Sequence, residues 1–130
     1  MANAVAVLMV ELEPPVMMTC ADAAIPKGTI LQLTHPLTVA ATDSTNDLFG
    51  GIAAEEKISG DGKLQIAVYR RGWFKVESGV DSTVGLPQVS HALNELTDLA
   101  ANDSDLGYVF GTALSTATNG EFYILDLGTQ

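Results

Sequence analysis

The sequence predicts a mainly β protein: a single compact β-barrel or β-sandwich domain built from two similar strand-loop-hairpin units, with an extended N-terminal arm and at most a short helix. Three observations support this fold class. Apolar residues make up 47% of the chain but aromatic residues only 6%, and the remainder is rich in β-branched residues, which fit strands, and in glycine, which fits turns. One stretch alternates as a half-buried strand does. Finally, motifs of the first half recur in the second.

The clearest strand signal lies in residues 48–74. A small-residue segment, Gly50–Ala54, precedes a Ser-Gly-Asp-Gly turn and the alternating run Lys63–Tyr69. This order predicts a β-hairpin. Successive strand side chains point to opposite faces of a sheet. The residues of this run expected to face the core are Leu64, Ile66 and Val68.

The first 19 residues are expected to form the arm, and residues 20–130 the single β-domain. The arm is apolar, and Val5, Val7 and Met9 occupy alternate positions in it. The two prolines at positions 14 and 15 prevent a helix or a central strand from continuing. The segment is either an edge strand of its own domain or an arm that pairs with a neighbouring subunit, because an unpaired apolar strand is a template for another chain.

Further strands are expected on both sides of the hairpin. Ile25–Thr34 has the pattern of a turn followed by a short strand, and the polar stretch Thr42–Asp47 has that of a loop. Leu86–Leu93 is expected to be a strand. A turn of helix is allowed near Asn94–Leu99, because the apolar residues there also fit helical spacing.

The two halves of the chain share short motifs. Leu33-Thr34-His35 is echoed by Val89-Ser90-His91, and Gly51-Ile52-Ala53 by Gly111-Thr112-Ala113. Residues 40–44 are likewise echoed by residues 100–104. We interpret this as a tandem duplication, with pseudo-repeats at about residues 28–72 and 85–128, although chance similarity in a chain rich in Ala, Thr and Gly is the alternative.

Charge and cysteine content exclude several classes of protein. Six Lys and Arg residues against 16 Asp and Glu give a net charge of −10, which argues against nucleic-acid binding, since that draws its affinity from basic residues. Cys20 is the sole cysteine, so no intrachain disulfide can form. The N-terminal apolar run follows no basic segment and is too short to span a bilayer. We therefore expect synthesis in the cytoplasm and no membrane partner.

No arrangement of residues predicts catalysis, a metal or a cofactor. His35 and His91 are isolated from each other and from Cys20, whereas a zinc site needs clustered ligands. Asn102–Gly107 begins like a calcium loop, but Leu114 stands where a bidentate glutamate is required, which leaves only a looser surface calcium site. No serine lies in a nucleophile elbow. We expect a protein that is not an enzyme, with no catalytic, metal-binding or cofactor-binding residues.

One basic patch interrupts the acidic chain and consists of Arg70, Arg71, Trp73 and Lys75. Tryptophan and arginine are over-represented at binding hot spots, so this patch could anchor a partner, for instance a neighbour's acidic edge. The alternative is that its aliphatic stems cover apolar surface while the charges stay solvated. Together with the apolar arm it gives the candidate interface residues Val5, Val7, Met9, Arg70, Arg71, Trp73 and Lys75.

A set of short motifs between Ile25 and Gly128 carries a family resemblance: IPKGTILQL, LTVAA, FGGIAAEE, GDGKLQIAVYRRGWF, VFGTAL and NGEFYILDLG. They resemble the small capsid decoration, or cement, proteins of tailed bacteriophages. The resemblance implies a compact β-barrel or β-sandwich and a non-catalytic virion protein. Such a protein binds the outer surface of the major capsid lattice and stabilises the head against internal DNA pressure.

The resemblance also implies partners and a location. The expected partners are the major capsid protein and further copies of the chain, as a homo-oligomer for which a trimer is expected, and the expected location is the capsid surface of the virion. The N-terminal arm would contact the lattice through Ala4–Val10. The alternative is a phage neck or tail structural or adaptor protein, and a small enzyme is the third hypothesis.

Overall fold

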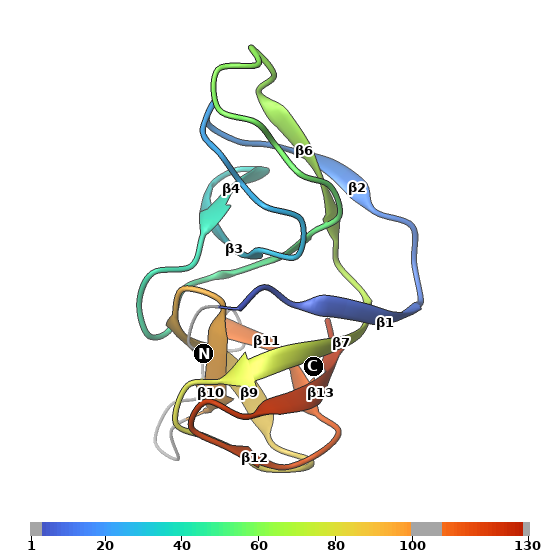
Figure 1. Ribbon diagram of the computed structural model, residues 1–130, viewed down its shortest axis with the longest axis vertical. Helices are drawn as coiled ribbons and strands as arrows, with labels where there is room; N and C mark the ends of the chain where they lie inside the picture. Colours follow the sequence, from blue (N-terminus) through green and yellow to red (C-terminus); the bar gives the residue numbers. More distant parts are fainter. Residues whose placement is uncertain (1–3, 100–107, 129–130) are drawn as a thin grey trace.

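The computed structural model describes residues 4–99 and 108–128, which form thirteen strands. These residues include no α-helix and no helix that is long and apolar enough to span a membrane. The predicted mainly β fold is confirmed. Figure 1 shows two lobes of strands stacked along the long axis of the molecule, with strand β1 lying across the level where they meet.

Each lobe is a closed barrel of five strands. The first closes in the order β2-β4-β3-β5-β6, and the second in the order β7-β10-β9-β11-β13, with β13 pairing back to β7. Strand β1 joins β7 from outside the second barrel, and β8 and β12 pair with each other. The strands of the first barrel are β2 (Val16–Thr19), β3 (Ile30–His35), β4 (Thr38–Ala41), β5 (Phe49–Ala53) and β6 (Gln65–Tyr69). The others are β1 (Val7–Glu11), β7 (Gly72–Ser78), β8 (Asp81–Ser82), β9 (Pro87–Ala92), β10 (Glu95–Asp98), β11 (Val109–Ala113), β12 (Ala117–Thr118) and β13 (Phe122–Leu127).

The two barrels have the same connectivity. In each, the first strand runs parallel to the third and antiparallel to the last, and the second strand pairs with both the third and the fourth. A bulge interrupts the pairing of the second strand with the fourth in both, at Gly50 and at Phe110. The chain is thus built from two similar units, as the recurring motifs predicted.

The register of the match differs from the one read from the sequence. Opposite the first residue of the fourth strand stands Gln32 in the first barrel and Val89 in the second. Val89 therefore corresponds to Gln32, and its predicted equivalence with Leu33 is wrong by one residue. The motif aligns the two histidines, His35 and His91, by residue type. The sheet instead aligns residues by the face of the strand that they occupy, and this alignment is shifted by one residue.

The N-terminal segment pairs within its own chain. Strand β1 runs antiparallel to β7, which is the edge-strand alternative, and β2 closes the first barrel between β4 and β6. Met18 and Cys20 at the end of β2 are buried in that barrel. A domain boundary after residue 19 stays a prediction. Strand β2, which ends at Thr19, lies on the N-terminal side of that boundary and belongs to the first barrel.

The predicted hairpin is present as β5 and β6, with Ile52 opposite Tyr69. Ile66 and Val68 are buried as expected. Leu64 is 57% exposed, so its assignment to the core is wrong, because the strand begins only at Gln65. Residues 87–92 form a strand as predicted, but the allowed turn of helix near residues 94–99 is instead strand β10.

One apolar core passes from one barrel into the other. Ile30 and Ile52 of the first barrel are fully buried and belong to the cluster that fills the second. The second-barrel members of this cluster include Phe74, Val76, Leu96, Phe110, Tyr123, Leu125 and Leu127. A separate cluster fills the rest of the first barrel: Met18, Cys20, Ile25, Leu31, Val39, Ala53, Ile66 and Val68.

Corresponding turns of the two barrels place a residue other than glycine in the left-handed region. They are Leu37 between β3 and β4, at φ 53°, and Asn94 between β9 and β10, at φ 59°. Asparagine tolerates this conformation, whereas leucine is strained in it. The Asn94 side chain also accepts a buried hydrogen bond of 2.9 Å from the backbone N–H of Ile30, and so ties the second barrel to the first.

Replacing Leu37 by Asn is expected to stabilise the protein by about 0.5–1 kcal/mol, because it relieves left-handed strain at a side chain that is 70% exposed. The urea midpoint measures the effect. The matched control is Asn94→Leu at the corresponding turn, which should cost about 2 kcal/mol because Ile30 N–H loses its buried acceptor. A Leu37→Asn protein no more stable than the wild type would contradict the strain argument.

Candidate interaction surface

The candidate site is a surface, since the described residues offer no reactive cluster. Within them, no group of three or more His, Cys, Asp or Glu side chains is placed to hold a metal ion. His35 and His91 lie in different barrels, and Cys20 is buried. The stretch considered for calcium, residues 102–107, lies outside the described residues.

Three neighbouring strands of the second barrel present apolar side chains to solvent. Phe74 and Val76 of β7 point into the core, so Trp73 and Lys75 point outward. Val7 of β1 stands opposite Lys75, and Val10 opposite Trp73. Strand β13 lies on the other side of β7 and places Ile124 opposite Lys75. Phe122, two residues before Ile124, points to the same outward side of β13. We call this surface the β1–β7–β13 face: Val7, Val10, Trp73, Lys75, Phe122 and Ile124.

Much of this face is exposed. Val7 is 54% exposed, Val10 and Trp73 are each 40% exposed, and Phe122 is 36% exposed. The Lys75 ammonium lies 5.6 Å from the centre of the Phe122 ring, a cation–π distance. A hollow at one end is lined by Ala4, Val5 and Val7 together with Lys75 and Phe122. Clustered apolar side chains rimmed by polar ones typically mark a protein contact.

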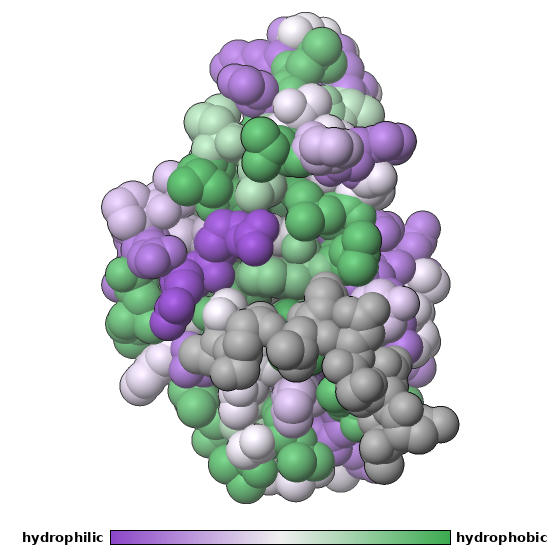
Figure 2. Space-filling view, turned by 180° about the vertical axis from the view of Figure 1, so that it is seen from behind, coloured by the Kyte–Doolittle hydropathy of each residue, from purple (hydrophilic) through white to green (hydrophobic). Residues whose placement is uncertain are grey.

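Figure 2 shows the side of the molecule that is turned away from the viewer in Figure 1. Figure 2 shows apolar residues in green interspersed with hydrophilic residues in purple over both lobes. Ala4 N–H donates a hydrogen bond of 3.2 Å to Oε1 of Glu77. This bond fixes the start of the described chain on β7, beside the hollow.

The structure brings together most of the predicted interface residues. Val5, Val7, Trp73 and Lys75 meet on or beside the β1–β7–β13 face, and Met9 is 51% exposed in a bulge of β1. Two members of the face, Phe122 and Ile124, were missed, and Val10 was named only as the end of the Ala4–Val10 segment expected to contact the lattice. The alternation of Phe122 with Tyr123 marks a strand, but its position beside β7 depends on a register that no local pattern carries.

Arg70 and Arg71 occupy different surroundings from Trp73 and Lys75. They lie in the connection from β6 to β7, which joins the barrels. The Arg70 guanidinium lies 4.4 Å from the centre of the Phe49 ring, and burial lowers the pKa of this group. Arg71 is exposed, and its stem passes close to Gly128 at the end of β13. The predicted basic patch is therefore divided.

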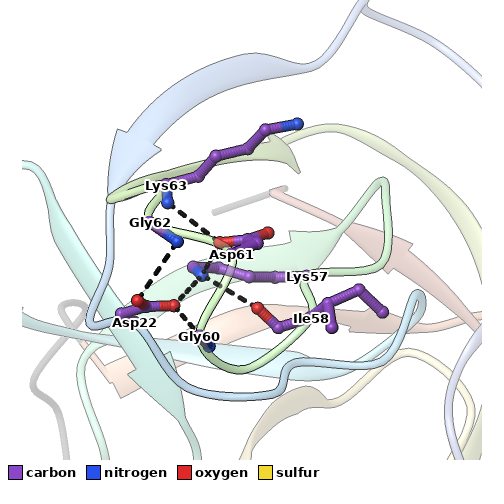
Figure 3. Close-up of polar contacts among 7 residues, drawn as sticks. All are labelled: Asp22, Lys57, Ile58, Gly60, Asp61, Gly62 and Lys63. Atoms are coloured by element: carbon purple, nitrogen blue, oxygen red, sulfur yellow. Dashed lines mark hydrogen bonds and ion pairs between the residues drawn. The ribbon is translucent and has the colours of Figure 1, made fainter.

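Lys57 is buried, and its ammonium group has three polar partners within the chain (Figure 3). Its Nζ lies 2.8 Å from Oδ1 of Asp22 and 2.7 Å from Oδ1 of Asp61, and it donates to the carbonyl of Ile58 at 3.3 Å. Asp22 also accepts the backbone N–H groups of Gly60 and Gly62. We call Asp22, Lys57 and Asp61 the Lys57 lock, because they hold the β5–β6 loop against the turn after β2.

The electrostatics of the Lys57 lock favour its charged form. Hydrogen bonds from Lys57 hold the pKa of Asp22 and of Asp61 below the ordinary value. Burial alone would lower the pKa of Lys57, but its hydrogen bonds to the two carboxylates outweigh burial and raise it. An ammonium with three occupied donors is no general base. No local pattern predicts this cluster, because its members come from two separate loops.

Acid titration should therefore release the Lys57 lock. Each carboxyl has a lowered pKa in the folded state, so its contribution to stability is complete above its unfolded pKa of about 3.9 and is lost as the pH falls through the folded value. We expect Asp22→Asn to be less stable than the wild type at pH 7 and to lose less stability on acidification. Urea midpoints between about pH 2 and pH 7 measure this.

The matched control is Glu56→Gln in the same loop, which is exposed and should leave the pH dependence unchanged. A second variant, Lys57→Met, should lower the melting temperature by about 5 °C or more, because two carboxylates lose their counter-ion. Equal acid sensitivity of Asp22→Asn and the wild type would contradict the assignment of Asp22.

The comparisons with known proteins concern the fold. No family model matches the chain, and no curated protein matches it. Among solved structures it is similar to the crystal structure of the N base of head fiber gp8.5 of bacteriophage phi29. The TM-score is 0.55 at 17% sequence identity, over 87% of this chain and 92% of that chain. The chain therefore shares its fold with the base of a bacteriophage head fiber.

Proposed function

We propose that this chain is a structural protein of a bacteriophage head, which binds the outer surface of the major capsid lattice and stabilises the head as a decoration protein. The observation that carries the proposal is the fold, which the chain shares along most of its length with the N base of the phi29 head fiber. The proposed location is the capsid surface of the virion.

The surface chemistry supports a binding role. Two of the buried polar arrangements, the Lys57 lock and the Asn94 bond to Ile30, are each satisfied by partners within the chain. The β1–β7–β13 face instead leaves Trp73 and Phe122 partly exposed, and aromatic side chains of this kind are typical anchors of protein contacts.

The proposed partners are the major capsid protein and further copies of this chain, in a homo-oligomer for which a trimer is the expectation. We assign these contacts to the β1–β7–β13 face. A chain with net charge −10 repels its own copies, and contacts between copies are favoured where apolar side chains outnumber carboxylates. On this face Lys75 supplies a positive charge among apolar residues, and Asp126, opposite Trp73, is the carboxylate beside them.

The test has two parts. Size-exclusion chromatography with light scattering gives the mass of the chain in solution, and co-sedimentation measures its binding to purified empty heads of the phage that encodes it. Binding to the heads and a higher temperature of head disruption are expected. Binding to necks or tails with none to heads would replace this function by that of a neck or tail protein.

Substitution on the β1–β7–β13 face should separate binding from folding. We expect Val7→Asp to weaken binding to heads by about tenfold or more, because a carboxylate would be buried without a partner in the contact. Its melting temperature should match the wild type, since Val7 is 54% exposed.

The control is Val84→Asp, at a valine that is 57% exposed and lies between β8 and β9, outside the β1–β7–β13 face. It should bind within about twofold of the wild type. Equal binding by Val7→Asp and Val84→Asp would remove the β1–β7–β13 face from the contact.

A further inference from the structure

Arg70 is held on an aromatic support at the junction of the barrels. Its guanidinium lies over the Phe49 ring. Phe49 in turn meets Phe110 edge to face, with ring centres 5.2 Å apart and planes at 72°. Phe110 is fully buried in the core that the barrels share. The orientation of the guanidinium is therefore set by residues from both barrels.

The backbone of Arg70 is also fixed. Gly128, at φ 86°, packs so closely that a Cβ atom there would collide with the Arg70 carbonyl oxygen. The neighbouring Tyr69 ring packs against Phe74, with ring centres 5.6 Å apart. A binding group whose side chain and backbone are both ordered loses little entropy when it engages a partner.

The donors of this ordered guanidinium are unused. An arginine has five N–H donors in a planar fork, and in the part of the chain that the structure describes the Arg70 fork makes no hydrogen bond or ion pair. Its one recorded interaction is with the Phe49 ring. The guanidinium is nevertheless partly buried, and burial lowers its pKa.

Lys57, the other cation with buried surroundings, differs from Arg70 because it is paired with carboxylates. The chain has 16 acidic residues for six basic ones, and it places two carboxylates on Lys57. A partly buried cation without an anion is unfavourable in isolation. In so acidic a chain, Arg70 is oriented and partly desolvated, and no carboxylate of residues 4–99 or 108–128 pairs with it. Its electrostatics therefore favour an anion supplied by a partner.

We infer that Arg70 is an anchor for an acidic protein surface, whose carboxylate its stacked guanidinium binds through two parallel hydrogen bonds. The inference rests on the proposed function and names the chemistry of its partner. The planar fork matches a carboxylate. A phosphate also fits a fork, but the polyanionic surface of a nucleic acid is repelled by the net charge of −10, whereas one protein carboxylate in a local contact is not.

The first experiment uses empty heads and Arg70 variants. Arg70→Gln should bind heads at least about tenfold more weakly than the wild type, since one charge-assisted bidentate contact is lost. Arg70→Lys keeps the charge but not the fork, and should recover only part of the affinity. The control Arg71→Gln removes the same charge from an exposed side chain that has no aromatic support, and should change binding by about twofold or less.

Melting temperatures identify any variant that fails to fold, and Arg70→Lys keeps the stem that covers Phe49. If the wild type binds heads and Arg70→Gln binds equally well, the inference is overturned and the proposed function stands. If Arg70→Gln and Arg71→Gln lose affinity equally, the effect is that of net charge and the anchor is again overturned.

The second experiment needs no head. The Nε–Hε NMR signals of Arg70 and Arg71 are followed in the wild-type protein during titration with a tetraglutamate peptide and, separately, with inorganic phosphate. A saturable shift of the Arg70 signal by the peptide, larger than that of Arg71, is expected. No shift at Arg70, or an equal response to phosphate at the same ionic strength, would overturn the carboxylate assignment, even if the wild type binds no heads and the proposed function fails.

Discussion

The core shared by the two barrels is the constraint on which the remaining structure depends. Ile30 and Ile52 belong to strands of the first barrel yet are fully buried against the second. Separating the barrels would expose both side chains, at about 1.5–3 kcal/mol each, and would strip the acceptor from Ile30 N–H. The same packing fixes Phe49 against Phe110. The position of Arg70 is therefore a consequence of how the barrels dock.

Duplication supplied one architecture and two different interiors. The isolated bridge between Ile25 and Lys57 in the first barrel corresponds to the pairing of Ser82 with Ala117 in the second. At this place the first barrel closes its loop with the Lys57 lock. The second has buried polar groups instead: the Tyr123 hydroxyl donates to Gln88 at 2.8 Å, and the Ser82 hydroxyl donates to Ser78 at 2.9 Å. The recurring backbone thus accommodates an ionic cluster in one barrel and neutral hydrogen-bonded groups in the other, because each arrangement gives its own side chains hydrogen-bond partners.

Local patterns predicted what local physics determines. Alternation marked β6 and its buried Ile66 and Val68, and recurring motifs marked the duplication. The surfaces depend on contacts between residues far apart in the chain. The registers of two strand pairs place Val10 and Phe122 beside β7. The docking of the barrels places the Arg70 guanidinium over Phe49, away from Trp73. No spacing of residues encodes either result, so the sequence alone could not show which of the predicted interface residues lie side by side.

Closure also decides how this protein can meet a partner. Barrel strands have neighbours on both sides. Strand β1 lies outside both barrels, as the short strands β8 and β12 do, and pairs with β7 alone in its sheet. Its free edge is short, ends at Glu11 and is followed by Pro14 and Pro15, which are features that discourage the addition of a further strand. Glu11 is also bonded to the Tyr69 hydroxyl at 3.3 Å. A partner is therefore better accommodated by the side chains of the β1–β7–β13 face and by Arg70 than by extension of the sheet, so specificity rests on the shape and charge of side chains.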